Sequence, residues 1–132
     1  MARTHRLLVV DDNPDITNLI GEIAQDDGFE VHRLNDSSAF YDRFGEIDPD
    51  VLCIGIHMPD VDGIEILRWL SNVDCRAAVI ILSGGDPLFT TVAERIGVAA
   101  KLQISTVPKP FQIGDFRKTL KDSLVAVRPD AA

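Results

Sequence analysis

Short, unbroken apolar runs alternate along this chain with longer segments in which apolar residues recur at helical spacing. Residues 7–10 are four apolar residues in succession, which is typical of a strand covered on both faces. Pro14 suits the first turn of a following helix, which we predict to end near Gly28. The apolar face of that helix is formed by residues at i, i+3, i+4 and i+7, namely Ile16, Leu19, Ile20 and Ile23.

The same alternation continues to the end of the chain. Further strands are predicted over residues 29–34, 51–56, 77–82 and 103–107, the last being broken by Pro108. A second helix is predicted around Phe40 and Phe44 after a cap at Asp36, and the remaining helices over 64–70, 86–98 and 111–127. Five strands that alternate with five helices predict βαβ units, and hence an α/β fold with helices on both faces of a parallel sheet.

Size and charge exclude several classes of protein. A chain of 132 residues, 45% hydrophobic and 26% charged, fits one folded domain over 1–132. Thirteen basic against 21 acidic residues give a net charge of −8, which argues against binding to nucleic acid or to a membrane surface. No apolar stretch is long enough to span a membrane, and two cysteines form no disulfide framework. We therefore expect a cytoplasmic protein with reduced thiols.

Polar residues follow the predicted strands at the edge where such sheets bind ligands. Asp11 and Asp12 follow the first strand, Ser83 the fourth and Lys109 the fifth. Adjacent carboxylates either raise the pKa of one member or recruit a cation, and Mg²⁺ favours such ligands. Lys109 could neutralise a carboxylate or bind a phosphoryl group, and Ser83 could donate a hydrogen bond to it. The simpler interpretation also stays open: a solvated turn with Asp12 capping the helix, an ordinary turn at Ser83 and an exposed loop lysine.

Four segments in this order resemble the receiver domain of two-component response regulators, from about residue 6 to 127. They are Leu7-Leu8-Val9-Val10-Asp11-Asp12, Met58-Pro59-Asp60-Val61-Asp62-Gly63, Val79-Ile80-Ile81-Leu82-Ser83-Gly84 and Lys109-Pro110-Phe111. The resemblance implies a flavodoxin-like, doubly wound, five-stranded sheet with strand order 2-1-3-4-5. It also implies that Asp11, Asp12 and the backbone carbonyl of His57 hold Mg²⁺, and that Ser83 and Lys109 contact the phosphoryl group. A cis Lys109–Pro110 bond would fit the family.

The chain departs from the family pattern at two positions. An aspartate that a histidine kinase phosphorylates stands three residues before Met-Pro in the family, and here that position is Gly55. Glycine cannot form an acyl phosphate and removes one carboxylate, so we expect Mg²⁺ to bind weakly or not at all. The family often carries an aromatic switch residue three positions before the lysine, where this chain has the smaller Thr106.

Two hypotheses about function follow from these departures. The favoured one is an atypical receiver module, a pseudo-receiver that is not an enzyme and acts through phosphorylation-independent protein contacts. The alternative is an ordinary phosphorelay receiver whose acceptor was mutated or is replaced by another residue, His57, Asp60 or Asp62 being the candidates. A phosphatase with Asp11 as nucleophile would need a spaced acidic pair and a lid, for which the chain has neither the spacing nor the length. A flavin carrier would need a phosphate-binding hydroxyl loop where the first strand ends in carboxylates. The expected partners are signalling proteins, a histidine kinase or an output partner, and the face formed by helices 86–98 and 111–127 could also bind a second copy.

Overall fold

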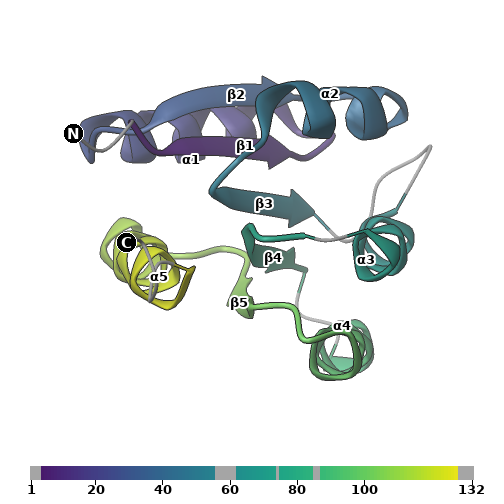
Figure 1. Ribbon diagram of the computed structural model, residues 1–132. Coiled ribbons are helices and arrows are strands. Elements are labelled where there is room, and N and C mark those ends of the chain that lie inside the picture. The colour runs from purple at the N-terminus through teal and green to yellow at the C-terminus, as the bar shows by residue number, and fades with distance from the viewer. Residues whose placement is uncertain (1–3, 56–61, 74, 85–86, 128–132) are drawn as a thin grey trace.

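The computed structural model describes residues 4–55, 62–73, 75–84 and 87–127, and these form one parallel sheet with helices on both faces (Figure 1). The strands are β1 (Arg6–Val10), β2 (Glu30–Leu34), β3 (Val51–Gly55), β4 (Ala78–Ser83) and β5 (Ile104–Pro108). The helices are α1 (Pro14–Asp26), α2 (Phe40–Ile47), α3 (Gly63–Asn72), α4 (Pro87–Ala100) and α5 (Ile113–Val127), with a 3-10 turn η1 (Ser37–Ala39) before α2. The predicted α/β fold is confirmed.

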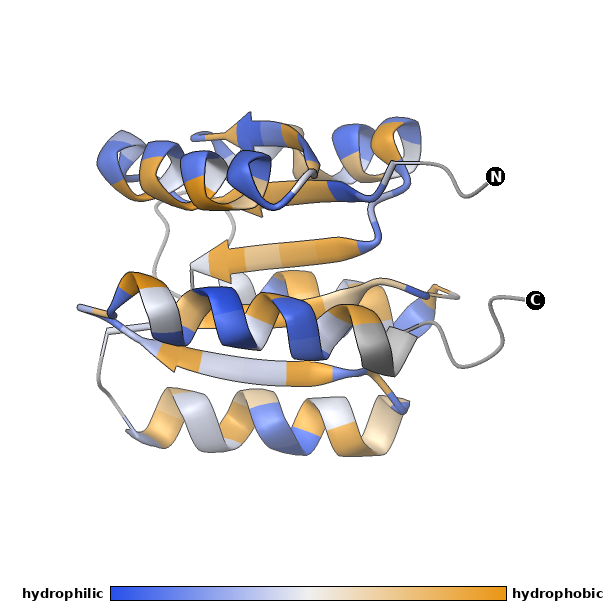
Figure 2. Cartoon of the chain, turned by 90° about the vertical axis from the view of Figure 1, so that its left-hand side faces the viewer, coloured by the Kyte–Doolittle hydropathy of each residue, from blue (hydrophilic) through white to orange (hydrophobic). Residues whose placement is uncertain are grey.

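The strand order in the sheet is β2-β1-β3-β4-β5, and each neighbouring pair is parallel. This is the order 2-1-3-4-5 that the resemblance implied. Strands β3 and β4 are buried along their whole length and β1 is buried from Leu7 onward, as their apolar runs predict. Figure 2 shows the consequence: apolar colour runs along β3 at the centre, whereas the helices carry hydrophilic colour on their outer sides.

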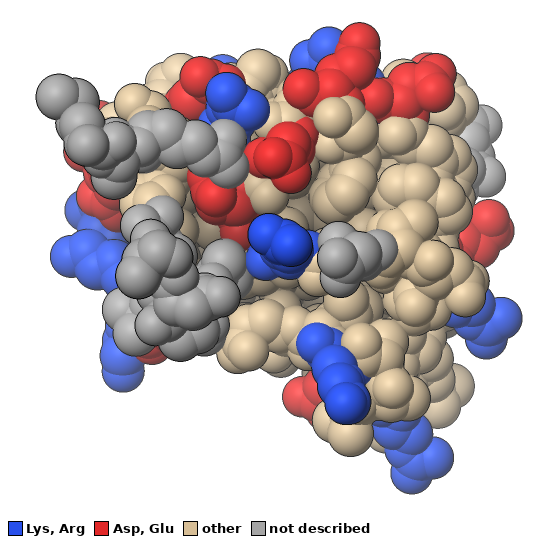
Figure 3. Space-filling model, in the orientation of Figure 1, with Lys and Arg blue, Asp and Glu red and all other residues tan. Residues whose placement is uncertain are grey.

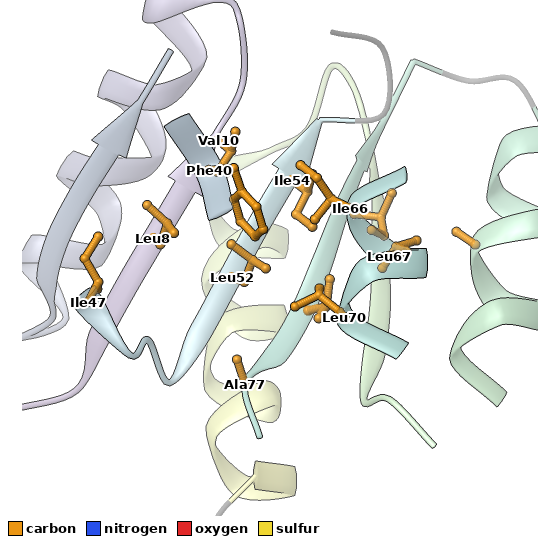
Figure 4. Packing of buried hydrophobic residues seen from close by; sticks show 13 residues of the cluster. Leu8, Val10, Phe40, Ile47, Leu52, Ile54, Ile66, Leu67, Leu70 and Ala77 are labelled. Atoms are coloured by element: carbon orange, nitrogen blue, oxygen red, sulfur yellow. The ribbon is translucent and has the colours of Figure 1, made fainter. Parts of the chain in front are cut away.

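Side chains of each strand alternate between two apolar clusters, one on each face of the sheet. The first cluster packs α2, α3 and α4 against Leu8, Val10, Leu52, Ile54, Val79 and Ile81 (Figure 4). The second packs α1 and α5 against Leu7, Val9, Val51, Cys53, Ile80 and Leu82. In Figure 4 the ring of Phe40 lies over Leu52, between β1 and α3. The two clusters bury the sheet between two layers of helices and leave the carboxyl ends of the strands for polar residues.

Side-chain caps fix where several helices begin. At α1 the cap is Asn13, whose Oδ1 accepts a hydrogen bond from the Asp15 amide, so Asp12 is not the cap that the simpler interpretation proposed. The predicted cap at Asp36 is present, but it begins the turn η1, which leads into α2. Asp62 caps α3 through the Glu65 amide. After α1 the chain turns at Gly28, whose φ of 90° favours glycine.

The fifth strand extends one residue further than predicted. Pro108 belongs to β5 and lies opposite Ser83. A proline is compatible with this strand because β5 lies at the edge of the sheet, where one side needs no backbone donor. The amide of Lys109 continues the pairing by donating to the Ser83 carbonyl oxygen at 2.7 Å, and the Lys109–Pro110 peptide bond is cis. Within the described residues, no helix is both long and apolar enough to cross a membrane.

Candidate functional site

Three of the predicted site positions lie on one side of the sheet at its carboxyl edge. In β1, Leu7 and Val9 face the cluster under α1 and α5, and Asp11 continues this alternation just beyond the strand. Gly55 continues the same side of β3 after Val51 and Cys53. Lys109 continues the side of β5 that carries Val107. The pleat therefore directs the side chains of Asp11 and Lys109 toward the same region.

The Asp11 carboxylate is buried and has partners for both of its oxygens. Only 1% of the residue is exposed. Oδ1 accepts a hydrogen bond from the Asn13 amide at 3.0 Å, and Oδ2 lies 2.8 Å from the ammonium nitrogen of Lys109. A buried carboxylate without a compensating charge would strongly destabilise the fold, and the Lys109 ammonium is the group that faces this carboxylate.

Gly55 makes room for this carboxylate. A Cβ atom placed on Gly55 would lie 2.5 Å from Asp11 Oδ2, too close for both atoms to stay in place, and 3.1 Å from Asp11 Cγ, a tight contact. The Asp11 carboxylate thus occupies space that a side chain at position 55 would need. Gly55 itself is buried at the end of β3 and contributes no ionisable group.

The ion pair crosses two strands of the sheet. Asp11 follows β1 and Lys109 follows β5, while β3 and β4 lie between them. Three strand spacings correspond to roughly 14 Å, which is too far for a contact within the plane of the sheet. The two side chains therefore meet beyond the strand ends. The carboxylate leans over Gly55 on β3, and the long lysine side chain extends inward from beyond β5. A Cβ at position 55 would require the Asp11 carboxylate to shift.

The fourth predicted residue, Ser83, ends β4 and is buried. It lies opposite Pro108 and beside a hollow of about 330 Å³. The hollow is lined by Ser83, Pro87, Thr90, Thr91, Thr106 and Pro108. Thr106 lies in the middle of β5, half-buried and paired with Ile81, so the position expected to hold a switch residue carries a small hydroxyl side chain beside open space.

The remaining candidates are not part of the buried ion pair. Asp12 is exposed. Asp62 accepts the Glu65 amide at 2.9 Å as the cap of α3. His57 and Asp60, proposed as a metal ligand and as substitute acceptors, lie outside the described residues.

The described donor atoms do not fit a divalent cation. Mg²⁺ requires oxygen ligands in near-octahedral geometry and retains several of its waters. Here one Asp11 oxygen holds an amide and the other an ammonium, and position 55 offers no oxygen from a side chain. Within the described part of the chain, no group of three or more His, Cys, Asp and Glu side chains is arranged to hold a metal. Weak or absent binding of Mg²⁺ at the site that the resemblance implied therefore remains a prediction.

The sequence did not predict two residues that hold Asp11 in place. Asn35 donates from Nδ2 to the Asp11 carbonyl oxygen and to Thr17 Oγ1, each at 2.9 Å, which ties the end of β1 to α1. Asn13 holds Asp11 with its amide while its side chain caps α1. An Asx turn at Asp11-Asp12-Asn13 is the sequence signal that could have indicated Asn13; nothing local indicates Asn35.

Comparisons with known proteins agree with this fold. Residues 7–121 match the response regulator receiver domain family. The chain is 32% identical to the chemotaxis protein CheY of Bacillus subtilis over 109 residues, 82% of this chain and 88% of that protein. It is 31% identical to the transcriptional regulatory protein TrcR of Mycobacterium tuberculosis over 119 residues, 90% of this chain. The chain spans 45% of the length of TrcR and 26% of that of the regulatory protein AtoC of Escherichia coli.

Solved structures show the same architecture. The signal receiver domain of an HD domain-containing protein from Pseudomonas fluorescens superposes with a TM-score of 0.85 at 18% identity, covering 97% of this chain and all of that one. A CheY-like receiver domain protein from Methanospirillum hungatei gives 0.83 at 20% identity, covering 96% of this chain and 98% of that one. At these identities the likeness concerns the fold, whereas the match over residues 7–121 extends to the sequence. The chain therefore belongs to the response regulator receiver domain family of two-component signalling.

Proposed function

We propose that this receiver domain is a pseudo-receiver that signals through protein contacts without phosphorylation at position 55, and that it has no enzymatic activity of its own. The observation that carries this proposal is Gly55. It supplies no carboxylate at the end of β3, and the space above it is filled by the carboxylate of Asp11. Transfer to an aspartate requires a carboxylate oxygen in line with the donor phosphorus, and position 55 has none.

The other carboxylates of the described site are poor substitutes for an acceptor. Asp11 is 1% exposed and both of its oxygens are engaged, so an acyl phosphate donor has no access to a free lone pair. Asp62 is committed to the amino end of α3. Phosphorylation of either carboxylate would first have to break these hydrogen bonds. These contacts support the proposal that the carboxylates of the pocket stabilise the fold and do not take part in phosphoryl transfer.

The surface of α4 supports a role in protein binding. Leu88 and Val98 on this helix are 66% and 83% exposed, and Ile113 at the start of α5 is 50% exposed. Contiguous patches of exposed apolar side chains often mark interaction sites. We propose that α4 and α5 contact the signalling partner, a histidine kinase or an output protein, and that the same face is available to a second copy. A Val98→Glu variant should weaken such binding without changing the fold.

The charge distribution supports a protein partner rather than nucleic acid. The chain carries a net charge of −8. On the face shown in Figure 3, acidic side chains gather toward the edge where α1, β2 and α2 lie, and basic side chains are scattered singly, one of them at the centre of the face. Nonspecific binding to phosphate backbones depends on clustered Lys and Arg.

Phosphoryl transfer from a small acyl phosphate donor in the presence of Mg²⁺, read by intact mass, tests the proposal. We expect the unmodified protein to remain unlabelled. A Gly55→Asp variant restores a carboxylate and is the positive counterpart, and Gly55→Ala controls for the added Cβ. Labelling of Gly55→Asp alone would show that position 55 is the missing acceptor.

Labelling of the unmodified protein would overturn the proposal and favour the alternative, a phosphorelay receiver with another acceptor. Peptide mapping would then locate the phosphoryl group among His57, Asp60 and Asp62.

A further inference from the structure

Four aromatic side chains pack together where α2 meets α3 (Figure 1). Phe40 is fully buried at the base of this group, whereas Tyr41 and Phe44 on α2 and Trp69 on α3 are half-buried. We call these three half-buried rings the aromatic surface. It contains the only tyrosine and the only tryptophan of the chain. Tyrosine and tryptophan are among the side chains that most often dominate the binding energy of protein interfaces.

The rings of the aromatic surface pack edge-on rather than in stacks. The planes of Phe44 and Trp69 lie at 90° with 5.6 Å between ring centroids, and those of Tyr41 and Trp69 at 60° with 5.0 Å. In an edge-on pair, the ring that contributes its edge keeps both of its faces out of the contact. Because all three rings are partly exposed, part of their π surface faces water.

Two carboxylates lie beside these rings. Asp62 caps α3, and Glu65 lies in the first turn of α3, four residues before Trp69 and therefore on the same side of the helix. Burial raises the pKa of the Tyr41 hydroxyl, and the negative charges of Glu65 and Asp62 raise it further, so both charges act on Tyr41. Neither carboxylate belongs to one of the ion pairs that the described residues form.

We infer that the aromatic surface and its two neighbouring carboxylates form a docking site for an arginine side chain on an exposed segment of a partner protein. A guanidinium is planar, so it can stack on an aromatic face through cation–π attraction while its N–H groups bind a carboxylate. The rings receive the first contact, and Asp62 or Glu65 receives the second. This site on α2 and α3 is separate from the surface of α4 and α5 and does not depend on the chemistry of position 55.

Charge decides which partner fits this site. The chain has a net charge of −8, so a second copy would bring further negative charge toward Asp62 and Glu65 and would be repelled. In Figure 3 uncharged side chains cover most of the area over α2 and α3, and acidic side chains gather along its upper border. A purely apolar partner would bury the two carboxylates without a counter-charge. Arginine fits better than lysine, whose compact ammonium is more strongly hydrated and does not stack.

Trp69 reports on its own surface, because it is the only tryptophan in the chain. The test is a titration with a short capped peptide in which arginine alternates with glycine, at an ionic strength of about 0.15 M, where attraction between distant exposed charges is largely screened. Matched peptides carry lysine or the neutral analogue citrulline in place of arginine. We expect a saturable change in Trp69 emission and in its indole N–H resonance with arginine, a weaker change with lysine and none with citrulline.

Glu65→Gln tests the acidic part of the site. Glu65 is exposed, so the variant should keep the fold while it removes one negative charge. Glu22→Gln is the matched control, because it removes the same charge from an exposed position of α1, on the other side of the sheet. We expect Glu65→Gln to weaken binding of the arginine peptide by roughly threefold, a loss typical of an exposed ion pair, and Glu22→Gln to leave it unchanged.

Phe44→Leu tests the aromatic part of the site and keeps Trp69 as the reporter. Phe111→Leu is the matched control, since Phe111 is also half-buried and in contact with another ring, but on the other face of the sheet. We expect Phe44→Leu to weaken binding of the arginine peptide by roughly threefold, the contribution of one exposed cation–π contact, whereas Phe111→Leu binds as the unmodified protein does.

Equal responses to the arginine and citrulline peptides would overturn the inference. So would equal weakening by Glu65→Gln and Glu22→Gln, because the attraction would then be nonspecific. The inference also fails if neither Trp69 signal shows a saturable change up to millimolar concentrations of the arginine peptide. A Trp69 emission that changes with protein concentration when no peptide is present would place a second copy on this surface instead. The measurement of phosphoryl transfer by intact mass is independent of all these outcomes.

Discussion

Gly55 on β3 and Asp11 after the neighbouring strand β1 share one space at the carboxyl edge of the sheet. A Cβ on Gly55 would overlap Oδ2 of Asp11, the oxygen that is bonded to Lys109. The absence of a side chain at one position is therefore linked to the position of a charged group at the other. A replacement at position 55 acts on Asp11 and Lys109 even when it introduces no charge.

Gly55→Ala should destabilise the fold for this reason. The added methyl group must push the Asp11 carboxylate aside and weaken its bond to Lys109, and overpacking of a buried site typically costs about 1–3 kcal/mol in the free energy of unfolding. Gly45→Ala is the matched control, because nothing lies within 4 Å of a Cβ at that exposed position in α2. Alanine in a helix should be neutral or stabilising there by roughly 0.5–1 kcal/mol. Urea unfolding of both variants measures the difference, and equal free energies of unfolding would contradict the overlap.

The two partners of the ion pair should respond unequally to neutralisation. Lys109→Met leaves a carboxylate of 1% exposure without its counter-charge, whereas Asp11→Asn leaves a lysine that is 29% exposed and able to turn toward water. Breaking a buried pair costs about 3 kcal/mol when the remaining charge stays buried, so Lys109→Met should lose about this much and Asp11→Asn clearly less.

A double-mutant cycle in urea at neutral pH, with Asp11→Asn/Lys109→Met as the double variant, measures both losses and their coupling. Additive effects of the two replacements would show that the contact contributes nothing to stability.

Much of the fold followed from local pattern. The apolar runs at 7–10 and 51–56 predicted strands covered on both faces, and β1 (Arg6–Val10) and β3 (Val51–Gly55) lie inside the sheet between two layers of helices. The rule that ligands bind at the carboxyl edge of a parallel sheet predicts Asp11, Ser83 and Lys109 at this edge, and all three lie at the ends of their strands there. Strand ends were less accurate: β5 continues through Pro108, because tolerance of proline depends on whether a strand lies at the edge, and only the assembled sheet decides this.

The contact between Asp11 and Lys109 was not specified by the sequence, although neutralisation by the lysine was one option. The two residues follow strands that are separated by two others, and their meeting depends on how far a carboxylate leans over position 55. The sequence showed that position 55 lacks a carboxylate. It did not show that the Asp11 carboxylate occupies the space left by the missing side chain, because only the tertiary structure decides which neighbour fills that space. Asn13 in place of Asp12 as the cap of α1 is a similar case, decided by backbone geometry at a single turn.

The two cysteines should differ in reactivity. Cys53 lies on β3 in the cluster under α1 and α5, fully buried, and this burial raises the pKa of its thiol far above the ordinary value. Cys75 is only half-buried. Because the thiolate is the reactive form, a thiol reagent at slightly alkaline pH should modify one cysteine in the native protein and both in denaturant. Mass mapping should place the native adduct on Cys75, and a Cys75→Ser variant should remain unmodified until it is unfolded; rapid native modification of Cys53 would contradict its burial.

Tyr41, the only tyrosine in the chain, should ionise at higher pH than a free tyrosine. Its ring packs edge-on against Trp69, with 5.0 Å between ring centroids. Burial raises the pKa of Tyr41 first, and the negative charges of Glu65 and then Asp62 raise it further, because each disfavours the charged tyrosinate. An ultraviolet pH titration should therefore have its midpoint above the ordinary value of about 10.

Glu65→Gln tests the electrostatic part of this shift. It should lower the midpoint of the Tyr41 titration relative to the unmodified protein, while Glu94→Gln on the distant helix α4 should leave it unchanged. The raised pKa also determines how stability depends on pH. A group that holds its proton more tightly in the folded state contributes its full stabilisation below its unfolded pKa. That contribution is lost as the pH rises from the ordinary tyrosine value through the raised one. In urea unfolding at alkaline pH, Glu65→Gln should accordingly lose less stability with rising pH than Glu94→Gln, and parallel losses in the two variants would show that Glu65 does not act on Tyr41.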